Sequence, residues 1–304
     1  MAIYIGPPKS LEELAAFLEI INKDDTTHIG YCGEKKIEIL VTLSNDFSDL
    51  DIEKSFVVAY EKGNIVGALG FDVDAERRIA EVWGPFIDNG KDNIEIANDL
   101  WEELETSMSF NINEYQFFVN EKNTFAKKFI EGRNGFESGH HLVLRAHRNS
   151  QTEDQDKKHI KNYAASCFQS FKALHSLSFP NTYYNSEEIL ARVSNDNRLI
   201  IIQHNNELKG YVYVEANSLQ GEGAIEYIAV APESRGQGIA KKLMKDALNH
   251  LFSYASIEEI TLSVEANNKA AIALYKASGF QVKYTLVAYK KVDNNHLDRE
   301  VRSS

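Results

Sequence analysis

The chain has 304 residues, of which 43% are apolar and 26% are charged, and its net charge is −12. This composition excludes a fibrous or disordered protein, and the length suits two domains. No apolar run reaches the roughly 18 residues of a membrane span, and the first residues do not read as a secretory leader. The two cysteines, Cys32 and Cys167, have no metal-ligand or CxxC spacing, so we expect a cytoplasmic protein without a disulfide framework.

The negative charge belongs to the first half of the chain. Residues 1–150 hold 15 basic and 27 acidic residues, whereas residues 151–304 hold 18 of each. Because the first half would repel a polyanion, we expect no nucleic-acid partner. A ligand that carries phosphate is expected to bind the second half.

In the first half, strand and helix patterns follow one another from residue 55. Residues 55–73 read as two alternating strands around the polar turn 62–64, and residues 80–86 read as a third strand. A helical pattern follows from residue 94. Residues 115–137 then read as a strand, a short helix and the start of another strand.

The second half repeats this order of elements at an offset of 143–145 residues, so that Gly210 matches Gly67 and Phe280 matches Phe136. Since this period is the length of a whole domain, the repeat predicts two tandem domains. We expect each to be an α/β (α+β) domain in which helices flank a mixed central sheet.

The boundary between the copies is expected in residues 148–158, which are polar and lack apolar periodicity. This linker would join a domain over residues 1–147 to a domain over residues 159–304. Residues 141–147 read as a strand that could close the first domain or open the second. A helix is expected over residues 157–175.

One loop in the second copy has the pattern of an anion-binding site. The strand Ile225–Val230 leads through a short turn to Arg-Gly-Gln-Gly-Ile-Ala at residues 235–240, which begin a helix. Unpaired N–H groups and the helix dipole favour negative charge there, and Gly236 and Gly238 would let a phosphate approach the backbone. The spacing fits neither a dinucleotide fingerprint nor a Walker loop. Taken by itself, the loop could also be an ordinary glycine-containing turn.

Two segments of the second copy resemble the signatures of the GCN5-related N-acetyltransferase (GNAT) family. IAVAPESRGQGIAKKLM, from Ile228, is similar to the family's acetyl-coenzyme A motif. VEANNKAAIALYKASGF, from Val264 to Phe280, is similar to the second signature, in which an Asn is followed seven residues later by Tyr and then by Gly-Phe. The resemblance covers residues 155–290, and the first copy reads as a diverged repeat.

The resemblance implies acetyl-CoA as cosubstrate, without a metal. The pyrophosphate would lie on the amides of the loop, and the pantetheine arm would run along the preceding strand, where the Val230 N–H would polarise the thioester carbonyl. Asn268 would contact the pantetheine arm or serve only as the N-cap of the following helix. The implied cofactor-binding residues are Ile228, Ala229, Val230, Arg235, Gly236, Gln237, Gly238, Ile239, Ala240 and Asn268.

Glu226 and Tyr275 are the candidate catalytic residues. Glu226 matches the position where some family members carry a glutamate that takes the proton of the amine. It alternates with Ile225 and Tyr227, so a glutamate that faces solvent or pairs with a lysine is an equal alternative. Tyr275 matches the family tyrosine that protonates the leaving thiolate, and the alternative is a core aromatic residue.

The first copy lacks these features. Val82 stands at the sequence position of Glu226, Ile130 replaces the tyrosine, and carboxylates surround the matching loop. We therefore expect a domain that binds no coenzyme A and is catalytically silent, and that lines the acceptor cleft, stabilises the pair or forms a homodimer. The loop residues concerned are Asp88, Gly90, Lys91, Asp92, Glu95 and Asp99.

The sequence thus predicts a tandem N-acetyltransferase whose second domain transfers an acetyl group from acetyl-CoA to a primary amine by direct attack in a ternary complex. The acceptor would be a small-molecule or peptide amine, and no residue pattern names it. The alternatives are a non-catalytic acyl-CoA-binding sensor or interaction module, and a structural scaffold. The presence of both Glu226 and Tyr275 favours the enzyme.

Overall fold

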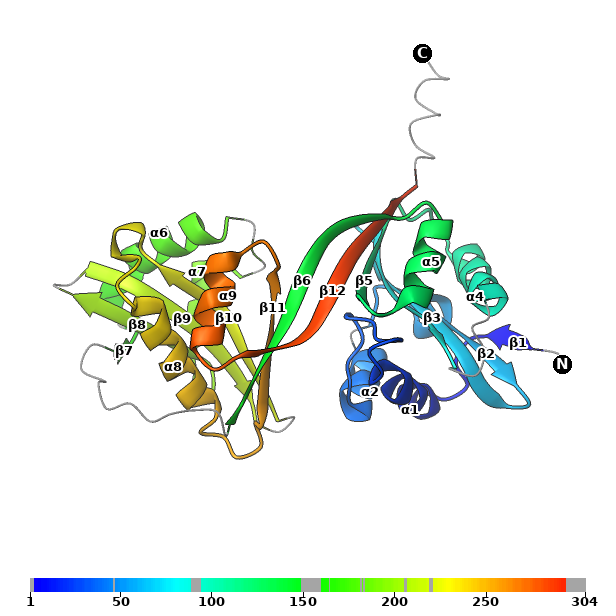
Figure 1. Cartoon of the computed structure of the whole chain (residues 1–304), viewed down its shortest axis with the longest axis horizontal. Coiled ribbons are helices and arrows are strands. Elements are labelled where there is room, and N and C mark those ends of the chain that lie inside the picture. The colour runs from blue at the N-terminus through cyan, green and yellow to red at the C-terminus, as the bar shows by residue number, and fades with distance from the viewer. Residues whose placement is uncertain are drawn as a thin grey trace, which may run out of the picture. The chain divides into compact units, whose positions relative to one another are not determined.

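The computed structural model divides into two compact units (Figure 1). Unit 1 comprises residues 1–141 and 284–304, and unit 2 comprises residues 142–283. Both units are mixed α/β structures with helices against a sheet, which confirms the expected fold class. The structure describes residues 3–45, 47–88, 94–148, 160–163, 165–180, 182, 184–204, 207–218 and 221–293.

The sheet of unit 1 begins with antiparallel strands and continues with a parallel pair. Its first five strands are β1 (Tyr4–Gly6), β2 (Phe56–Glu61), β3 (Asn64–Asp74), β4 (Ile79–Ile87) and β5 (Glu114–Asn120). β1 to β4 pair antiparallel in the order of the chain, and β4 pairs with β5 in parallel. The predicted turn between β2 and β3 has positive φ at Lys62 and Gly63, which suits a tight hairpin.

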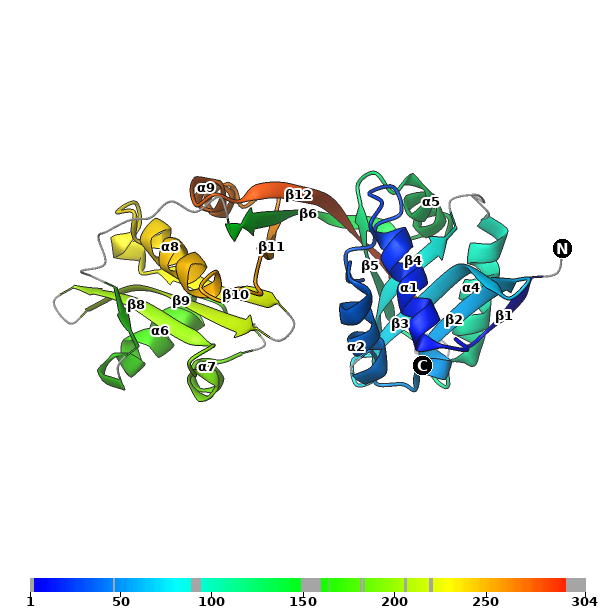
Figure 2. The same ribbon diagram turned by 90° about the horizontal axis from the view of Figure 1, so that it is seen from below.

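Helices cover both faces of this sheet. They are α1 (Leu11–Asn22), α2 (Lys36–Asn45), α3 (Ile52–Ser55), α4 (Ile94–Ser107) and α5 (Thr124–Gly132). Figure 2 shows α1 and α2 on one face and α4 and α5 on the other. The apolar stripe of α4, which includes Leu100 and Trp101, is buried against β2 and β3.

Unit 2 contains a second antiparallel meander. Its strands are β7 (Ile160–Asn162), β8 (Arg198–His204), β9 (Glu207–Asn217) and β10 (Glu222–Val230). The remaining elements are the 3-10 turns η2 (Ala165–Cys167) and η3 (Pro232–Ser234), the helices α6 (Phe168–Ser178), α7 (Ser186–Arg192), α8 (Ile239–Leu251) and α9 (Lys269–Ala277), and the strand β11 (Glu259–Glu265). One face carries the α6-side core around Phe171, Tyr211 and Tyr213. The opposite face carries the α8-side core around Leu243 and Leu248.

The two units exchange strands. β6 (Phe136–His147) starts in unit 1 and belongs to unit 2 from residue 142, where Leu144 and Ala146 are buried in the α8-side core. β12 (Gln281–Val292) belongs to unit 1 from residue 284, where it pairs antiparallel with β5 and buries Val287 and Tyr289. Each unit is therefore completed by a strand from the other copy of the repeat.

The expected boundary at residues 148–158 differs from this division. His141 falls in unit 1 and residues 142–147 fall in unit 2, whereas the last strand of the expected second domain lies in unit 1 from residue 284. Arg148, expected in the linker, is bound to unit 2, where its guanidinium donates to the carbonyl oxygens of Phe252, Tyr254 and Ile257. Residues 149–158 lie outside the described residues.

The expected helix over residues 157–175 was also wrong in extent. β7 occupies residues 160–162, η2 follows, and α6 begins only at Phe168. Cys167 is buried at the end of η2. The expected helix included residues 160–162, which instead form the strand that pairs with β8.

A pair of carboxylates in the sheet of unit 1 makes its stability depend on pH. Asp72 lies directly opposite Glu81, and burial together with Glu81 and Asp49 raises the pKa of Asp72 to about 7. The native unit thus holds a proton that the unfolded chain, with a carboxyl pKa of ~3.9, has lost, so stability falls as pH rises from about 4 to about 7.

We expect Asp72→Asn to stabilise the protein at pH 8 and to leave it unchanged at pH 4. Because the side chain is partly exposed, solvent screening reduces the gain to on the order of 1–2 kcal/mol. Urea unfolding at both pH values measures it. Asp74→Asn, on the same strand, is the control, and an Asp72 variant that gains nothing over it at pH 8 contradicts the assignment.

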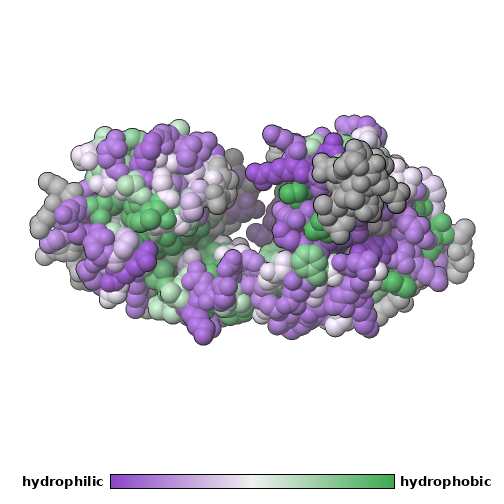
Figure 3. Space-filling model, turned by 90° about the horizontal axis from the view of Figure 1, so that it is seen from above, coloured by the Kyte–Doolittle hydropathy of each residue, from purple (hydrophilic) through white to green (hydrophobic). Residues whose placement is uncertain are grey.

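On the face drawn in Figure 3, hydrophilic residues cover most of the visible part of unit 1, at the right. The exposed large apolar side chains of the described residues, such as Ile20, Ile37 and Leu177, stand on different helices. Among the described helices we find none that combines the length and apolar character of a membrane span.

Candidate active site

The strand β10 contains a β-bulge at Glu226. Ile225 lies opposite Val214 and Tyr227 lies opposite Tyr213, so Glu226 is the extra residue in the backbone register. The bulge also changes the side on which side chains point, because Ile225 packs towards the α8-side core and Tyr227 belongs to the α6-side core. The expected simple alternation of Glu226 with both neighbours is therefore corrected.

Beyond the bulge, β10 has an open edge. It is the last strand of the sheet β10-β9-β8-β7, and the nearby β11 is the last strand of the other sheet. The Ala231 N–H donates to the Lys209 carbonyl on β9, at 3.0 Å. Since backbone polar groups alternate between the two edges of a strand, those of Ile228 and Val230 point away from β9.

The three residues expected to pair with a pantetheine arm therefore differ in the direction of their backbone N–H and C=O groups. Ile228 and Val230 offer their N–H and C=O groups at the open edge. Ala229 lies opposite Tyr211, and its polar groups turn towards β9. Ala229 therefore fits a packing role in the α6-side core, where its side chain is buried.

The loop after β10 presents a row of unused amides. Lys242 N–H donates to the Gly238 carbonyl at 3.2 Å and closes the first turn of α8. Among the described residues, none accepts a hydrogen bond from the N–H groups of residues 236–241. These amides, at a helix start without a side-chain cap or an acidic residue in its first turn, are donors of the kind that bind an anion.

Two glycines give the loop this shape. Gly236 has φ +76° and Gly238 has φ +74°, in the left-handed region where a side chain is strained. A Cβ atom at either position would meet nothing within 4 Å, so the loop is open beside its backbone. Arg235 adds a positive charge, and its Nε lies 3.4 Å from the Val230 carbonyl oxygen. Gln237, Ile239 and Ala240 complete the segment.

Tyr275 and Asn268 lie on the adjacent helix α9. Tyr275 is half-buried, its ring centroid is 5.7 Å from that of Phe280, and it packs against the α8-side core, as do Ile228 and Val230. Burial raises the pKa of the Tyr275 phenol, so it is protonated at neutral pH. Asn268 caps α9 by accepting from the Ala271 N–H at 3.1 Å, and its side chain is otherwise exposed.

The end of β10, the start of α8 and Tyr275 thus all pack against the α8-side core. Residues 165–280 match the family model described as Acetyltransferase (GNAT) family. This segment is a GNAT acetyltransferase domain.

Known proteins share this segment and the fold. Mycothiol acetyltransferase of Paenarthrobacter aurescens (strain TC1) is 31% identical over 101 residues, which are 32% of this chain and 31% of that protein, so the match spans about a third of that relative. Spermidine N(1)-acetyltransferase of Vibrio cholerae serotype O1 is 26% identical over 132 residues, 43% of this chain and 70% of that protein. A tandem GNAT protein from the clavulanic acid biosynthesis pathway has a TM-score of 0.66 at 13% identity, over 96% of this chain and 98% of that one, and shows a like fold.

Sequence reasoning missed the residues that hold the loop between α6 and α7 beside the GNAT strand β10. The buried Tyr227 hydroxyl contacts Thr182 Oγ1 at 2.5 Å and accepts from the Tyr184 N–H at 3.3 Å. His175 contacts the Tyr211 hydroxyl at 2.5 Å and the Tyr184 carbonyl oxygen at 2.8 Å. An apolar pattern identifies these rings as core residues but does not reveal their hydroxyl partners.

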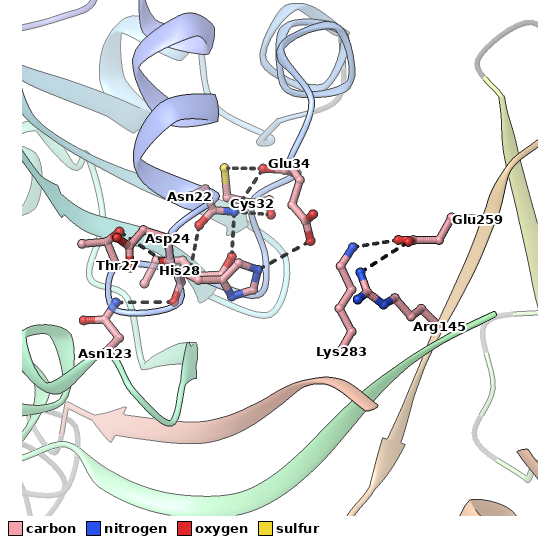
Figure 4. A network of polar contacts seen from close by, with 12 residues as sticks. Asn22, Asp24, Thr27, His28, Cys32, Glu34, Asn123, Arg145, Glu259 and Lys283 are labelled. Atoms are coloured by element: carbon pink, nitrogen blue, oxygen red, sulfur yellow. Dashed lines mark hydrogen bonds and ion pairs between the residues drawn. The ribbon is translucent and has the colours of Figure 1, made fainter. Parts of the chain in front are cut away.

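In unit 1 the residues that match Asn268 and Tyr275 are buried. Asn123, the counterpart of Asn268, is buried, and its Nδ2 donates to the His28 carbonyl at 3.4 Å, as Figure 4 shows. Ile130, the counterpart of Tyr275, is fully buried. Asp88, Glu95 and Asp99 are exposed near the start of α4, and Gly90, Lys91 and Asp92 lie outside the described residues.

The register corrects one expected equivalence. Val82 lies opposite Phe71, as Ile225 lies opposite Val214, so Val82 matches Ile225. β4 has its own irregularity, which follows Trp83, and the pairs Phe86–Ala68 and Ala229–Tyr211 match again beyond the two bulges. The two strands are therefore equally long here and differ in where the bulge falls.

Proposed function

We propose that this protein is an N-acetyltransferase that transfers the acetyl group of acetyl-CoA to a small-molecule or peptide primary amine, with its active site in unit 2. The observation that carries the proposal is the row of unused amides at residues 236–241, which continues from the open edge at Ile228 and Val230. A diphosphate and an extended amide-containing arm are the two ligand parts that such a surface binds.

The chemistry follows from the order of these groups. The loop amides and Arg235 hold the pyrophosphate, and the edge of β10 pairs with the pantetheine amides. The Val230 N–H donates to the thioester oxygen as negative charge develops there, a contact of about 3–4 kcal/mol in other acyl-transfer sites. The amine forms its C–N bond as the C–S bond breaks, so one proton leaves nitrogen and one reaches sulfur.

Glu226 and Tyr275 are the proposed proton carriers. Glu226 takes the amine proton, directly or through water. It lies in the bulge, outside the regular pairing of β10 with β9. Tyr275 donates to the thiolate, and the phenolate then regains a proton from solvent. Because burial raises the phenol pKa above that of a thiol, a hydrogen bond to the developing thiolate is the larger part of this contribution.

Unit 1 is proposed to be catalytically silent and to bind no coenzyme A, because its asparagine is occupied and its tyrosine is replaced by buried Ile130. Among the described residues, no group of three acidic, histidine or cysteine side chains could hold a metal ion. The buried free thiols of Cys32 and Cys167 suit a reducing cytoplasm.

Calorimetry of the full chain with acetyl-CoA, followed by measurement of thiol release with an amine panel, tests the proposal. We expect one acetyl-CoA per chain and turnover with at least one class among polyamines, aminoglycosides, amino acids and peptides. Binding without turnover for every class would favour the acyl-CoA sensor. Absence of acetyl-CoA binding would favour the structural scaffold instead.

We expect Glu226→Gln to lower kcat with the preferred amine by roughly a hundredfold at neutral pH and to leave acetyl-CoA affinity unchanged. The amide keeps the size of the side chain but cannot accept the proton. Raising the pH should recover part of the rate, since more of the amine is then already deprotonated. Glu222→Gln, on the same strand, is the control. A Glu226 variant with the turnover of this control would show that the carboxylate is not the base.

A further inference from the structure

Unit 1 contains a hollow of ≈ 740 Å³ that the acetyl-transfer chemistry does not use. It is lined by α4, the end of α5, the start of β5 and the end of β12, all within unit 1. Its volume is that of a small-molecule pocket. A diverged copy that keeps such a hollow has the means to bind a ligand of its own.

Two cations line the hollow over an aromatic floor. The guanidinium carbon of Arg133 lies 4.0 Å from the ring centroid of Phe129 and 5.2 Å from that of Trp101. Lys291 Nζ lies 4.7 Å from the ring centroid of Tyr115 and 5.9 Å from that of Trp101. Both positive charges therefore converge on one buried tryptophan.

Arg133 is the less satisfied of the two cations. Its Nη1 donates to Asn98 Oδ1 at 2.7 Å, and among the described residues no carboxylate lies within ion-pair distance of it. Lys291, in contrast, lies 3.2 Å from Asp293 Oδ1. Burial lowers the pKa of Arg133, an effect that the nearby Glu105 and Glu102 carboxylates only partly offset. A carboxylate can meet two guanidinium N–H groups at once and would offset the remaining cost of burial.

The other residues that line the hollow favour a ligand that also carries a positively charged group and an apolar group. Glu102 and Glu105 line it from α4, and Glu105 accepts from the Tyr115 hydroxyl at 3.4 Å. These carboxylates would repel a phosphate or a dicarboxylate, and Arg133 with Lys291 would repel a simple polyamine. Met108 and Phe110 add half-buried apolar surface.

We propose that this hollow binds a free α-amino acid with an apolar side chain. Its carboxylate would pair with Arg133, its ammonium group with Glu102, and its side chain would contact Met108 and Phe110. A zwitterion is the small ligand that satisfies both signs of charge in the hollow. The proposal stands independently of acetyl transfer in unit 2.

Calorimetry of the full chain tests it with phenylalanine, phenethylamine and 3-phenylpropionate, which share one ring and differ in the two charges. We expect phenylalanine to bind at least roughly tenfold more tightly than either analogue. Arg133→Met should weaken phenylalanine by a similar factor. Glu102→Gln should weaken phenylalanine but not phenylpropionate, a selectivity that a general loss of structure would not produce.

Arg77→Met and Glu76→Gln, exposed positions of the same unit, are the matched controls. Trp101 and Trp83 are the two tryptophans of the chain, so fluorescence in a Trp83→Phe background reports on Trp101 and checks that each variant is folded. If Arg133→Met does not fold, the proposal is decided by Glu102→Gln, which should lose affinity for phenylalanine but not for phenylpropionate. Absence of phenylalanine binding at millimolar concentration, equal binding of the three compounds, or unchanged binding by the folded variants would overturn the proposal.

Discussion

Gly238→Glu should abolish acetyl-CoA binding, with a loss of affinity of roughly a hundredfold or more. Gly238 has φ +74° and ends the open loop at the first turn of α8. A glutamate there would be strained, and its carboxylate would take or shield the amides that otherwise meet the pyrophosphate. Calorimetry with acetyl-CoA measures the change, and all turnover with amines should disappear with it.

Gly63→Glu separates this effect from backbone strain. Gly63 also has positive φ, at +85°, and a Cβ atom there would likewise meet nothing within 4 Å, but it lies in the β2–β3 turn of unit 1. Both variants should therefore lose similar thermal stability, while Gly63→Glu keeps its acetyl-CoA affinity. If Gly238→Glu binds as tightly as Gly63→Glu, the loop is not the diphosphate site.

Tyr275→Phe should lower kcat by roughly a hundredfold while the affinity for acetyl-CoA stays unchanged. Phenylalanine keeps the ring that packs beside Phe280 and against the α8-side core, and only the hydroxyl is removed. Without a donor at the sulfur, the thiolate must leave unassisted. Steady-state thiol release gives kcat, and calorimetry gives the affinity.

Tyr163→Phe is a suitable control because Tyr163 is also a half-buried tyrosine of unit 2 but packs against the α6-side core. It should retain full turnover. A Tyr275→Phe enzyme that matches it in kcat would remove the phenol from the mechanism. A large fall in acetyl-CoA affinity would instead make Tyr275 part of the binding surface.

Local patterns predicted most of the elements around the site. The helices that follow the two signatures begin where the sequence indicates, α8 at Ile239 and α9 at Lys269, because glycine and asparagine mark helix starts. The bulge at Glu226 was hidden, since Ile225-Glu226-Tyr227 reads as ordinary alternation. An extra residue in a strand becomes visible only when the strand is aligned with its partner.

The exchange of β6 and β12 was hidden for a different reason. These strands occupy equivalent places in the two copies of the repeat, and their starts match at an offset of 144–145 residues. Each has the pattern that either sheet requires. Periodicity therefore identifies them as strands but carries no information about which of two related sheets each one completes.

The exchange of strands makes each copy of the repeat necessary for the interior of the other unit. The segment 136–147 of the first copy supplies Leu144 and Ala146 to the α8-side core of unit 2, and Arg148 binds the carbonyl oxygens of the turn after α8. Deleting the first copy would remove β6 and expose the α8-side core of unit 2. A nick between the copies would leave two fragments, each of which lacks a strand that the other supplies. The two copies can therefore diverge in what they bind, but neither can be removed without exposing the interior of the other unit.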